Sequence, residues 1–177
     1  MRLVWLARML YRWAVRYSDE HRPTQVITDG VSTRTYLLRW KLRNSTRWFP
    51  GLYLHHMILD DQAVPHDHPY WSLSIALTDG ITEEYCSEPE LSGEPALERR
   101  VVRQGQVVWR SSRFAHRLTI DPRGAMTLFL AGPRSRQDGW GFFCPNSGWT
   151  YHRIYSRRRR AAANAGALTV NSGCGED

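Results

Sequence analysis

The amino-acid sequence predicts an all-β protein, an antiparallel sandwich or barrel with one helix before it and a disordered tail after it. Nine short runs between residues 24 and 132 are rich in β-branched and aromatic residues, which is typical of strands. Pairs such as Asp79-Gly80 and Gln104-Gly105 separate these runs as turns do. Many short strands joined by hairpin turns, with almost no helical spacing between them, favour a sandwich or barrel.

The predicted strands follow one another closely along the chain. They cover residues 24–28, 34–42, 52–59, 71–77, 81–86, 97–102, 106–110, 116–120 and 126–132. An aromatic segment at residues 138–155 is expected to cap one end of the barrel. The barrel is therefore assigned to residues 21–156 of a single domain, because 177 residues are enough for one sizeable core.

The N-terminal segment predicts an amphipathic helix over residues 2–17, with residues 1–20 packed on the barrel. Apolar residues recur on one face at intervals of three and four. They are Leu6, Met9, Leu10, Trp13 and Tyr17. Arginines Arg8, Arg12 and Arg16 line another face and are expected to be solvated, although such a helix can also lie on a membrane surface or on nucleic acid.

The C-terminal residues 157–177 predict a basic, disordered tail, because an arginine run is followed by small residues. The run allows weak nucleic-acid contact, in keeping with the net charge of +7. Its members are Arg157, Arg158, Arg159 and Arg160. No apolar run approaches the roughly 18 residues that cross a bilayer, and no membrane partner is expected.

The three cysteines Cys86, Cys144 and Cys174 form no CxxC pair, which favours buried thiols at Cys86 and Cys144 and a cytoplasmic location.

Two histidines one residue apart, His66 and His68, are the strongest chemical signal. Alternate side chains of a strand share a face, which places the two imidazoles about 7 Å apart along the strand while Asp67 points elsewhere. His116, after a later strand and turn, supplies a third nitrogen. Three neutral imidazoles on one side of an ion leave the opposite side open for water, oxygen or substrate. The pattern therefore predicts a mononuclear metal site.

Several other residues are candidates for chemistry near this site. His55 and His56 are neighbours on one predicted strand, and the pattern does not decide which faces the interior; His56 is taken as a candidate catalytic residue. Tyr85 is a candidate proton donor to bound oxygen. Arg117 and Arg134 are candidates to bind a carboxylate or phosphate. Trp140 is a candidate floor of the substrate pocket. Glu83 and Glu84 are expected in a solvated hairpin, with replacement of a metal ligand as the alternative.

These motifs resemble those of the cupin superfamily. Its first motif, HxH followed by a glycine, is matched by His66, His68 and Gly80, but the glutamate expected near Ser72 or Leu73 is absent. The second motif, a glycine, an apolar strand and a histidine, is matched by Gly105, Val107, Val108 and His116. The resemblance implies a double-stranded β-helix, or jelly roll, with a three-histidine site similar to that of cysteine dioxygenase-type thiol dioxygenases. A wider likeness from Tyr36 to Trp149 is to small uncharacterised cupins of bacteria and bacteriophages.

The resemblance implies a metal-binding cupin, an Fe(II)-dependent oxygenase or dioxygenase acting on a small anionic molecule. Mn, Ni or Zn are alternatives to iron. Two other functions remain open: a metal-independent sugar- or nucleotide-binding cupin or isomerase, and a basic accessory protein of nucleic acids. Cupin barrels often pair, which makes a homodimer an expectation.

Overall fold

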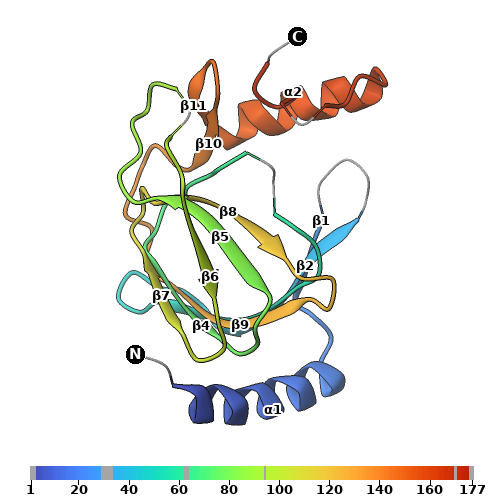
Figure 1. Ribbon diagram of the computed structural model, residues 1–177, viewed down its shortest axis with the longest axis vertical. Coiled ribbons are helices and arrows are strands. Elements are labelled where there is room, and N and C mark those ends of the chain that lie inside the picture. Colours follow the sequence, from blue (N-terminus) through green and yellow to red (C-terminus); the bar gives the residue numbers. More distant parts are fainter. Residues whose placement is uncertain (1–2, 29–33, 62–63, 94, 170, 176–177) are drawn as a thin grey trace.

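The chain folds into a two-sheet barrel with a helix at either end (Figure 1). The computed structural model describes residues 3–28, 34–61, 64–93, 95–169 and 171–175. The larger sheet has six strands in the order β1-β2-β3-β9-β4-β7, and the smaller has three in the order β6-β5-β8. A separate hairpin, β10-β11, follows the barrel. Every strand pair is antiparallel.

The strands lie where the alternating sequence runs place them. The larger sheet contains β1 (Gln25–Thr28), β2 (Thr35–Arg43), β3 (Gly51–Met57), β4 (Ser72–Ala76), β7 (Val107–Arg110) and β9 (Ala125–Ala131). The smaller sheet contains β5 (Ile81–Cys86), β6 (Glu98–Val102) and β8 (Ala115–Ile120). The hairpin contains β10 (Gly141–Cys144) and β11 (Gly148–Tyr151). Strand β9 lies between β3 and β4, and β8 pairs with β5, so strands distant in sequence are neighbours. The prediction of an all-β jelly-roll barrel with an N-terminal helix is confirmed.

The core lies between the two sheets. Strand β4 alternates buried and half-buried residues along its whole length, as a strand with one face on the core must. The cluster at the core draws apolar side chains from both sheets. Its buried members are Leu37, Met57, Ala76, Ile81, Val102, Val108, Ile120 and Ala125.

Helix α1 (Val4–Glu20) packs on the barrel through a narrower face than the sequence predicts. Ala7 and Ala14 are fully buried, whereas Met9 and Trp13, expected on the packed face, are 53% and 41% exposed. The small alanine side chains allow the helix backbone to approach the sheet closely, which turns the bulkier neighbours outward. The backbone N–H of Leu3 donates to the carbonyl of Gly105, 2.9 Å away, and fixes the start of the helix.

Helix α2 (His152–Asn164) contradicts the prediction of a disordered tail from residue 157. Alanine and arginine are strong helix formers, and Tyr155 is buried with its ring 3.8 Å from that of Phe142. A disulfide joins Cys144 to Cys174, so the expectation of a free thiol at Cys144 is also wrong. Residues 170, 176 and 177 of the predicted tail lie outside the described part of the chain.

The remaining cysteine, Cys86, is a partly buried free thiol. The prediction of a cytoplasmic location, which rested in part on the expected absence of a disulfide, stays a prediction. Neither described helix has the length and apolar character that crossing a bilayer requires.

Candidate metal centre

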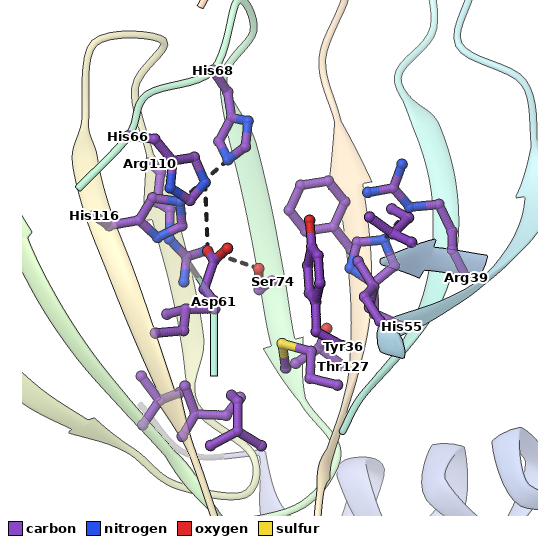
Figure 2. A pocket seen from close by; sticks show the side chains of 18 of the residues that line it. Tyr36, Arg39, His55, Asp61, His66, His68, Ser74, Arg110, His116 and Thr127 are labelled. Carbon is purple, nitrogen blue, oxygen red and sulfur yellow. Dashed lines mark hydrogen bonds and ion pairs between the residues drawn. The ribbon is translucent and has the colours of Figure 1, made fainter. Parts of the chain in front are cut away.

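A cavity of about 400 Å³ opens inside the barrel between the two sheets. Figure 2 shows side chains of both walls pointing into it. One wall carries His66, His68 and His116, and the opposite wall carries Arg39 and His55. The end of the cavity nearer helix α1 is lined by apolar side chains of the core cluster, so the cavity has polar walls and an apolar floor.

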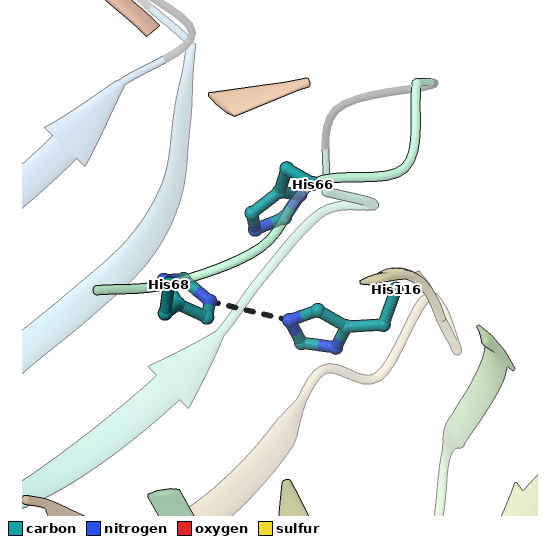
Figure 3. Close-up of side chains that lie close together, drawn as sticks. All are labelled: His66, His68 and His116. Atoms are coloured by element: carbon teal, nitrogen blue, oxygen red, sulfur yellow. Dashed lines mark hydrogen bonds between the residues drawn. The ribbon is translucent and has the colours of Figure 1, made fainter. Parts of the chain in front are cut away.

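The three histidines predicted as metal ligands converge on one point (Figure 3). One ring nitrogen from each of His66, His68 and His116 lies within 4.8 Å of the others. The Nε2 atoms of His68 and His116 are 3.2 Å apart. His66 and His116 are buried and His68 is half-buried. The structure therefore brings together two segments that are far apart in sequence.

The HxH segment is held by β8 and β10 and does not lie within a strand of its own. The backbone N–H groups of His66 and His116 each donate to the other's carbonyl at 2.9 Å. The N–H of Asp67 donates to the carbonyl of Gly141. The expectation that the two histidines lie within a strand is wrong, since β4 starts only at Ser72. The alternation of side chains still holds, because the segment is extended.

Asp67 points away from the cavity and fixes the segment from behind. Its carboxylate is 1% exposed and accepts hydrogen bonds from the Gly141 N–H at 2.8 Å, the Arg136 guanidinium at 2.5 Å and the Trp149 indole at 3.2 Å. Burial raises the pKa of Asp67. The Gly141 and Trp149 donors tie the HxH segment to the hairpin β10-β11, and Arg136 ties it to the segment before that hairpin.

Glu83 orients His116 and is the main site residue that the sequence placed wrongly. The sequence predicted a solvated hairpin, yet the side chain is 0% exposed. Its carboxylate accepts hydrogen bonds from Nδ1 of His116 at 2.8 Å, Nε of Arg110 at 2.6 Å and Nε of Arg100 at 2.7 Å. Burial alone raises the pKa of Glu83, but the charge of Arg110 and the hydrogen bond from His116 more than reverse this, and the net shift is downward. A buried carboxylate is accommodated because every partner is a cation or an N–H donor.

The Glu83–His116 contact settles which nitrogen of His116 faces the cavity. An ionised carboxylate accepts only, so the proton of His116 lies on Nδ1 and the lone pair on Nε2 points towards His68. Ligating histidines commonly donate their other N–H to a carboxylate in this way. Burial is the largest cause that lowers the pKa of His68 and of His116, and for His116 the hydrogen bond to Glu83 partly offsets this lowering.

The donor set fits a divalent transition metal. Neutral imidazole nitrogens suit Fe, Zn, Cu and Ni, and the three rings lie 5.0 to 5.4 Å apart between centroids. Nδ1 of His66 is buried and has no hydrogen-bond partner among the described residues. The Asp61 carboxylate lies 3.5 Å from Nε2 of His66 and also lines the cavity.

Of the other predicted site residues, only Trp140 lines the cavity, with its ring 5.9 Å from that of His66. Tyr85 lies beyond Phe114, and its hydroxyl donates to Glu98. Arg117 donates to Glu84 at 2.6 Å on the outer face of β8. The structure therefore does not support Tyr85 as a proton donor or Arg117 as a substrate ligand.

Two further candidates lie outside the cavity. His56 points to the opposite side of β3, towards helix α1, where it lines a separate surface pocket with Tyr11 and Trp40. Its neighbour His55 occupies the inner position, because adjacent side chains of a strand alternate. Arg134 is exposed, and its Nε donates to the backbone carbonyl of Arg136. Neither His56 nor Arg134 lines the cavity that holds the three histidines.

On the wall opposite the histidines, the sequence did not indicate Arg39 and left open whether His55 or His56 faces the interior. Arg39 and His55 both line the cavity, and Nε of Arg39 donates to Nε2 of His55 at 2.9 Å. Burial first, and then the charge of Arg39, lower the pKa of His55 well below its usual value. Strand β2 is apolar on both faces around Arg39, with Leu37 and Leu38 preceding it, so alternation alone does not show which face is internal.

Comparisons with known proteins leave the family open. No model of a known protein family matches the chain, and no curated protein matches it. Solved structures with a similar fold include "Crystal structure of DMSP lyase DddQ" from Ruegeria pomeroyi, at 17% identity over 64% of this chain and 54% of that chain, TM-score 0.45. Another is Fe(II)-HppE with an alternative substrate, at 12% identity over 64% of this chain and 56% of that chain, TM-score 0.48.

A third similar structure is KdgF from a Halomonas species, at 15% identity over 68% of this chain and 94% of that chain, TM-score 0.45. The chain spans about half the length of the DMSP lyase and HppE structures that it matches. Likenesses this distant identify no reaction, and the fold assignment rests on the strand order itself.

Proposed function

We propose that the protein is a mononuclear metal enzyme, an Fe(II)-dependent oxygenase or dioxygenase that acts on a small anionic molecule. The convergence of His66, His68 and His116 within 4.8 Å at the wall of a cavity inside the barrel carries this proposal. Iron is the proposed ion, with manganese, nickel and zinc as the alternatives. A divalent ion bound there supplies a Lewis acid with open positions for oxygen and substrate.

The surrounding residues support this chemistry in three ways. Glu83 holds His116 in the tautomer that presents Nε2 to the cavity. Trp140 covers one side of His66 and His68 and limits the access of water. Three neutral ligands leave the full charge of a divalent ion uncompensated by the ligands themselves, which favours an anionic substrate.

Metal analysis of the purified protein tests the proposal. We expect close to one Fe(II) per chain in anaerobically purified wild-type protein, and a loss of most of it in His66→Ala and His116→Ala. His21→Ala is the matched control, because His21 is an exposed histidine at the end of α1 and its loss leaves the metal content unchanged. Oxygen uptake with a panel of small thiols and organic acids then tests the reaction.

Full metal content in His66→Ala contradicts the proposed site. A wild-type protein that binds no divalent metal, and that binds a nucleotide sugar in calorimetry, instead supports a metal-independent binding or isomerase function. If iron-loaded wild-type protein takes up no oxygen with any compound of the panel, the oxygenase assignment is contradicted. The proposed metal site is not affected by that result.

We also propose weak nucleic-acid contact through helix α2, because its arginine run is ordered on one exposed helix. The exposed members are Arg157, Arg158 and Arg160. Binding to a DNA duplex, measured by fluorescence anisotropy, should weaken steeply with salt, and the double variant R157Q/R160Q should reduce the salt slope by about two. The variant R99Q/R103Q, which removes two exposed arginines on and next to β6, is the control. Equal binding by both double variants contradicts the contact.

A further inference from the structure

A row of polar residues crosses four neighbouring strands on the concave face of the larger sheet. Gln25 of β1 is paired with Arg39 of β2, Arg39 with His55 of β3, and His55 with Thr127 of β9. Residues directly opposite in antiparallel strands share a face, and all four line the cavity. Figure 2 shows Arg39, His55 and Thr127 of this row on the wall that faces the three histidines.

Within this row Arg39 carries a positive charge, and none of the described carboxylates forms an ion pair with it. Its Nε donates to Nε2 of His55 at 2.9 Å and its Nη1 donates to Oε1 of Gln25 at 3.2 Å. Both acceptors are neutral, and no carboxylate contacts Arg39 in the described part of the chain. A guanidinium has five N–H donors, so donors on Nη1 and Nη2 stay available beyond these two bonds.

The other arginine of the cavity differs from Arg39 in this respect. Arg110 is 6% exposed, and it donates to the buried carboxylate of Glu83 and to the hydroxyl of Ser74. Its charge is therefore matched within the protein. Arg39 is held from behind by His55 and Gln25 while its charge stays uncompensated, which is the arrangement that a bidentate oxyanion site requires.

The floor between the two walls is apolar. It is formed by side chains from both sheets, namely Leu37, Met57, Ala76, Ile81, Val102, Leu118 and Ile120. A ligand that fills this volume presents an apolar body to the floor, and Arg39 is the arginine of the wall that has no carboxylate partner among the described residues. The cavity volume of about 400 Å³ suits a molecule of small organic acid size.

We propose that Arg39 is the anion-binding residue of this cavity and that the substrate class is small organic monocarboxylates with an apolar body. The carboxylate accepts hydrogen bonds from the free donors of Arg39, the body lies on the apolar floor, and the opposite end reaches the His66–His68–His116 wall. The contact between the opposite end and the histidine wall rests on the proposed metal function. The contacts of the carboxylate with Arg39 and of the body with the floor depend only on the cavity.

Calorimetry with simple probes tests the assignment. The titrants are benzoate and butyrate, with benzamide as the uncharged counterpart of benzoate and inorganic phosphate as a second anion. The protein is wild-type chain loaded with Zn²⁺, so that no turnover occurs, and the same chain after chelation. We expect benzoate to bind at least about ten-fold more tightly than benzamide, because the charged hydrogen bonds are lost with the amide.

Variants assign the effect to Arg39. Arg39→Gln should weaken benzoate binding by about 10- to 100-fold while Zn²⁺ content and circular dichroism stay as in the wild type. Lys41→Gln is the matched control, because it removes one positive charge from an exposed position of the same strand outside the cavity. Its effect on benzoate binding should stay within about two-fold, as expected for a screened surface charge. Arg39→Lys keeps the charge without the planar fork and should fall between wild type and Arg39→Gln.

Three outcomes overturn the assignment: no binding of either carboxylate to wild-type protein, unchanged benzoate binding in Arg39→Gln, or tighter binding of phosphate than of benzoate. Failure of the proposed metal function is seen separately. In that case the chain binds no metal, yet benzoate still binds the chelated protein and still depends on Arg39.

Discussion

The imidazole of His116 connects the cavity to a charged cluster buried in the smaller sheet. Its Nε2 faces His68 at 3.2 Å, and its Nδ1 donates to Glu83 at 2.8 Å. Glu83 in turn is bound by Arg100 and Arg110. Ring orientation, tautomer and charge at the candidate metal site therefore depend on one carboxylate that does not itself reach the cavity wall.

Replacement of that carboxylate is predicted to weaken metal binding without removing a ligand. Glu83→Gln should lower metal affinity about 10- to 100-fold, as for other residues that orient ligating histidines. It should also lower the free energy of unfolding by about 3–5 kcal/mol, because Arg110 keeps a buried charge without its partner. Competition with a chromogenic chelator measures the first effect and urea unfolding the second.

Glu84→Gln is the control for this prediction. Glu84 is the neighbouring carboxylate, paired with Arg117 at the surface, and exposed pairs contribute at most about 1 kcal/mol. The variant should retain the metal affinity of the wild type. Equal metal affinity in Glu83→Gln and the wild type would show that Glu83 has no role in orienting His116.

His55 makes the folded state sensitive to acid. Burial and the charge of Arg39 lower its pKa in the folded protein, while the unfolded chain keeps a value near about 6.5. Below about pH 6.5 the unfolded state takes up a proton that the folded state does not. Stability is therefore fully present above about pH 6.5 and is lost as the pH falls towards the folded-state pKa.

Urea unfolding of chelated wild-type and His55→Gln protein between pH 8 and pH 5 measures this contribution. Glutamine keeps an acceptor for Arg39 and does not titrate, so the wild type should lose more stability on acidification than the variant. All other residues are the same in the two proteins, so the difference between the two pH curves reports His55. Parallel pH curves for the two proteins would exclude His55 as the source.

Residue-scale prediction from sequence succeeded where the signal was local. His66 and His68 are two residues apart, and an extended backbone alone places them on one side, which the structure shows even outside a strand. Glu83 was misplaced because its partners Arg100 and Arg110 come from two other strands. The register of the sheets sets which side chains pair across strands, and a short sequence pattern does not predict that register.

At the scale of elements, helix α1 is positioned by a turn of the barrel. Gly105 has a φ of +79°, and its carbonyl accepts the N–H of Leu3. A Cβ at this position would lie 2.7 Å from the backbone N of Val4 and 2.8 Å from the carbonyl carbon of Leu3. The glycine that resembled a cupin motif in the sequence therefore also allows the helix to approach the barrel.

Gly105→Ala is predicted to displace the start of α1. The left-handed conformation alone costs about 1–2 kcal/mol for alanine, and the backbone contact adds to it. Gly166→Ala is the matched control, because Gly166 has a φ of +71° and nothing lies within 4 Å of its Cβ position. Thermal unfolding should show a larger loss for Gly105→Ala, and hydrogen exchange should rise in residues 4–10. Equal losses would show that the helix contact contributes nothing.

Helix α2 shows where composition misled the prediction. Four arginines followed by alanines suggested a solvated tail, but the same residues have high helix propensity. Tyr155 and Ile154 are the large apolar residues of this helix, and Tyr155 alone is buried, against Phe142. One aromatic contact is too sparse a pattern to indicate a packed helix from sequence.

At the scale of the whole molecule, the C-terminal region closes over the end of the barrel that holds the histidines. Phe142 contacts both His66 and Tyr155, with ring centroids 5.6 and 3.8 Å away. The disulfide between Cys144 and Cys174 joins two points 30 residues apart in sequence. The cluster of Val64, Phe142, Cys144, Tyr155 and Cys174 thus couples the terminal segment to the candidate site.

Removal of this cross-link is predicted to destabilise the protein. Cys174→Ser should lower the free energy of unfolding by about 2–4 kcal/mol, chiefly because the unfolded chain gains freedom. Dithiothreitol should lower the stability of the wild type and leave Cys174→Ser unchanged. Cys86→Ser, which removes the free thiol, should behave as the wild type does. A wild-type stability that is insensitive to reduction would contradict the cross-link.

The central claim is that one divalent ion is bound by three imidazoles from two distant segments of an all-β barrel. Anomalous diffraction at the metal absorption edge, from crystals grown after anaerobic loading with Fe(II), tests it most directly. We predict a single peak bonded to nitrogens of His66, His68 and His116 at roughly 2.0–2.2 Å. A peak at another place in the molecule, or none in the cavity of fully loaded protein, would contradict the account.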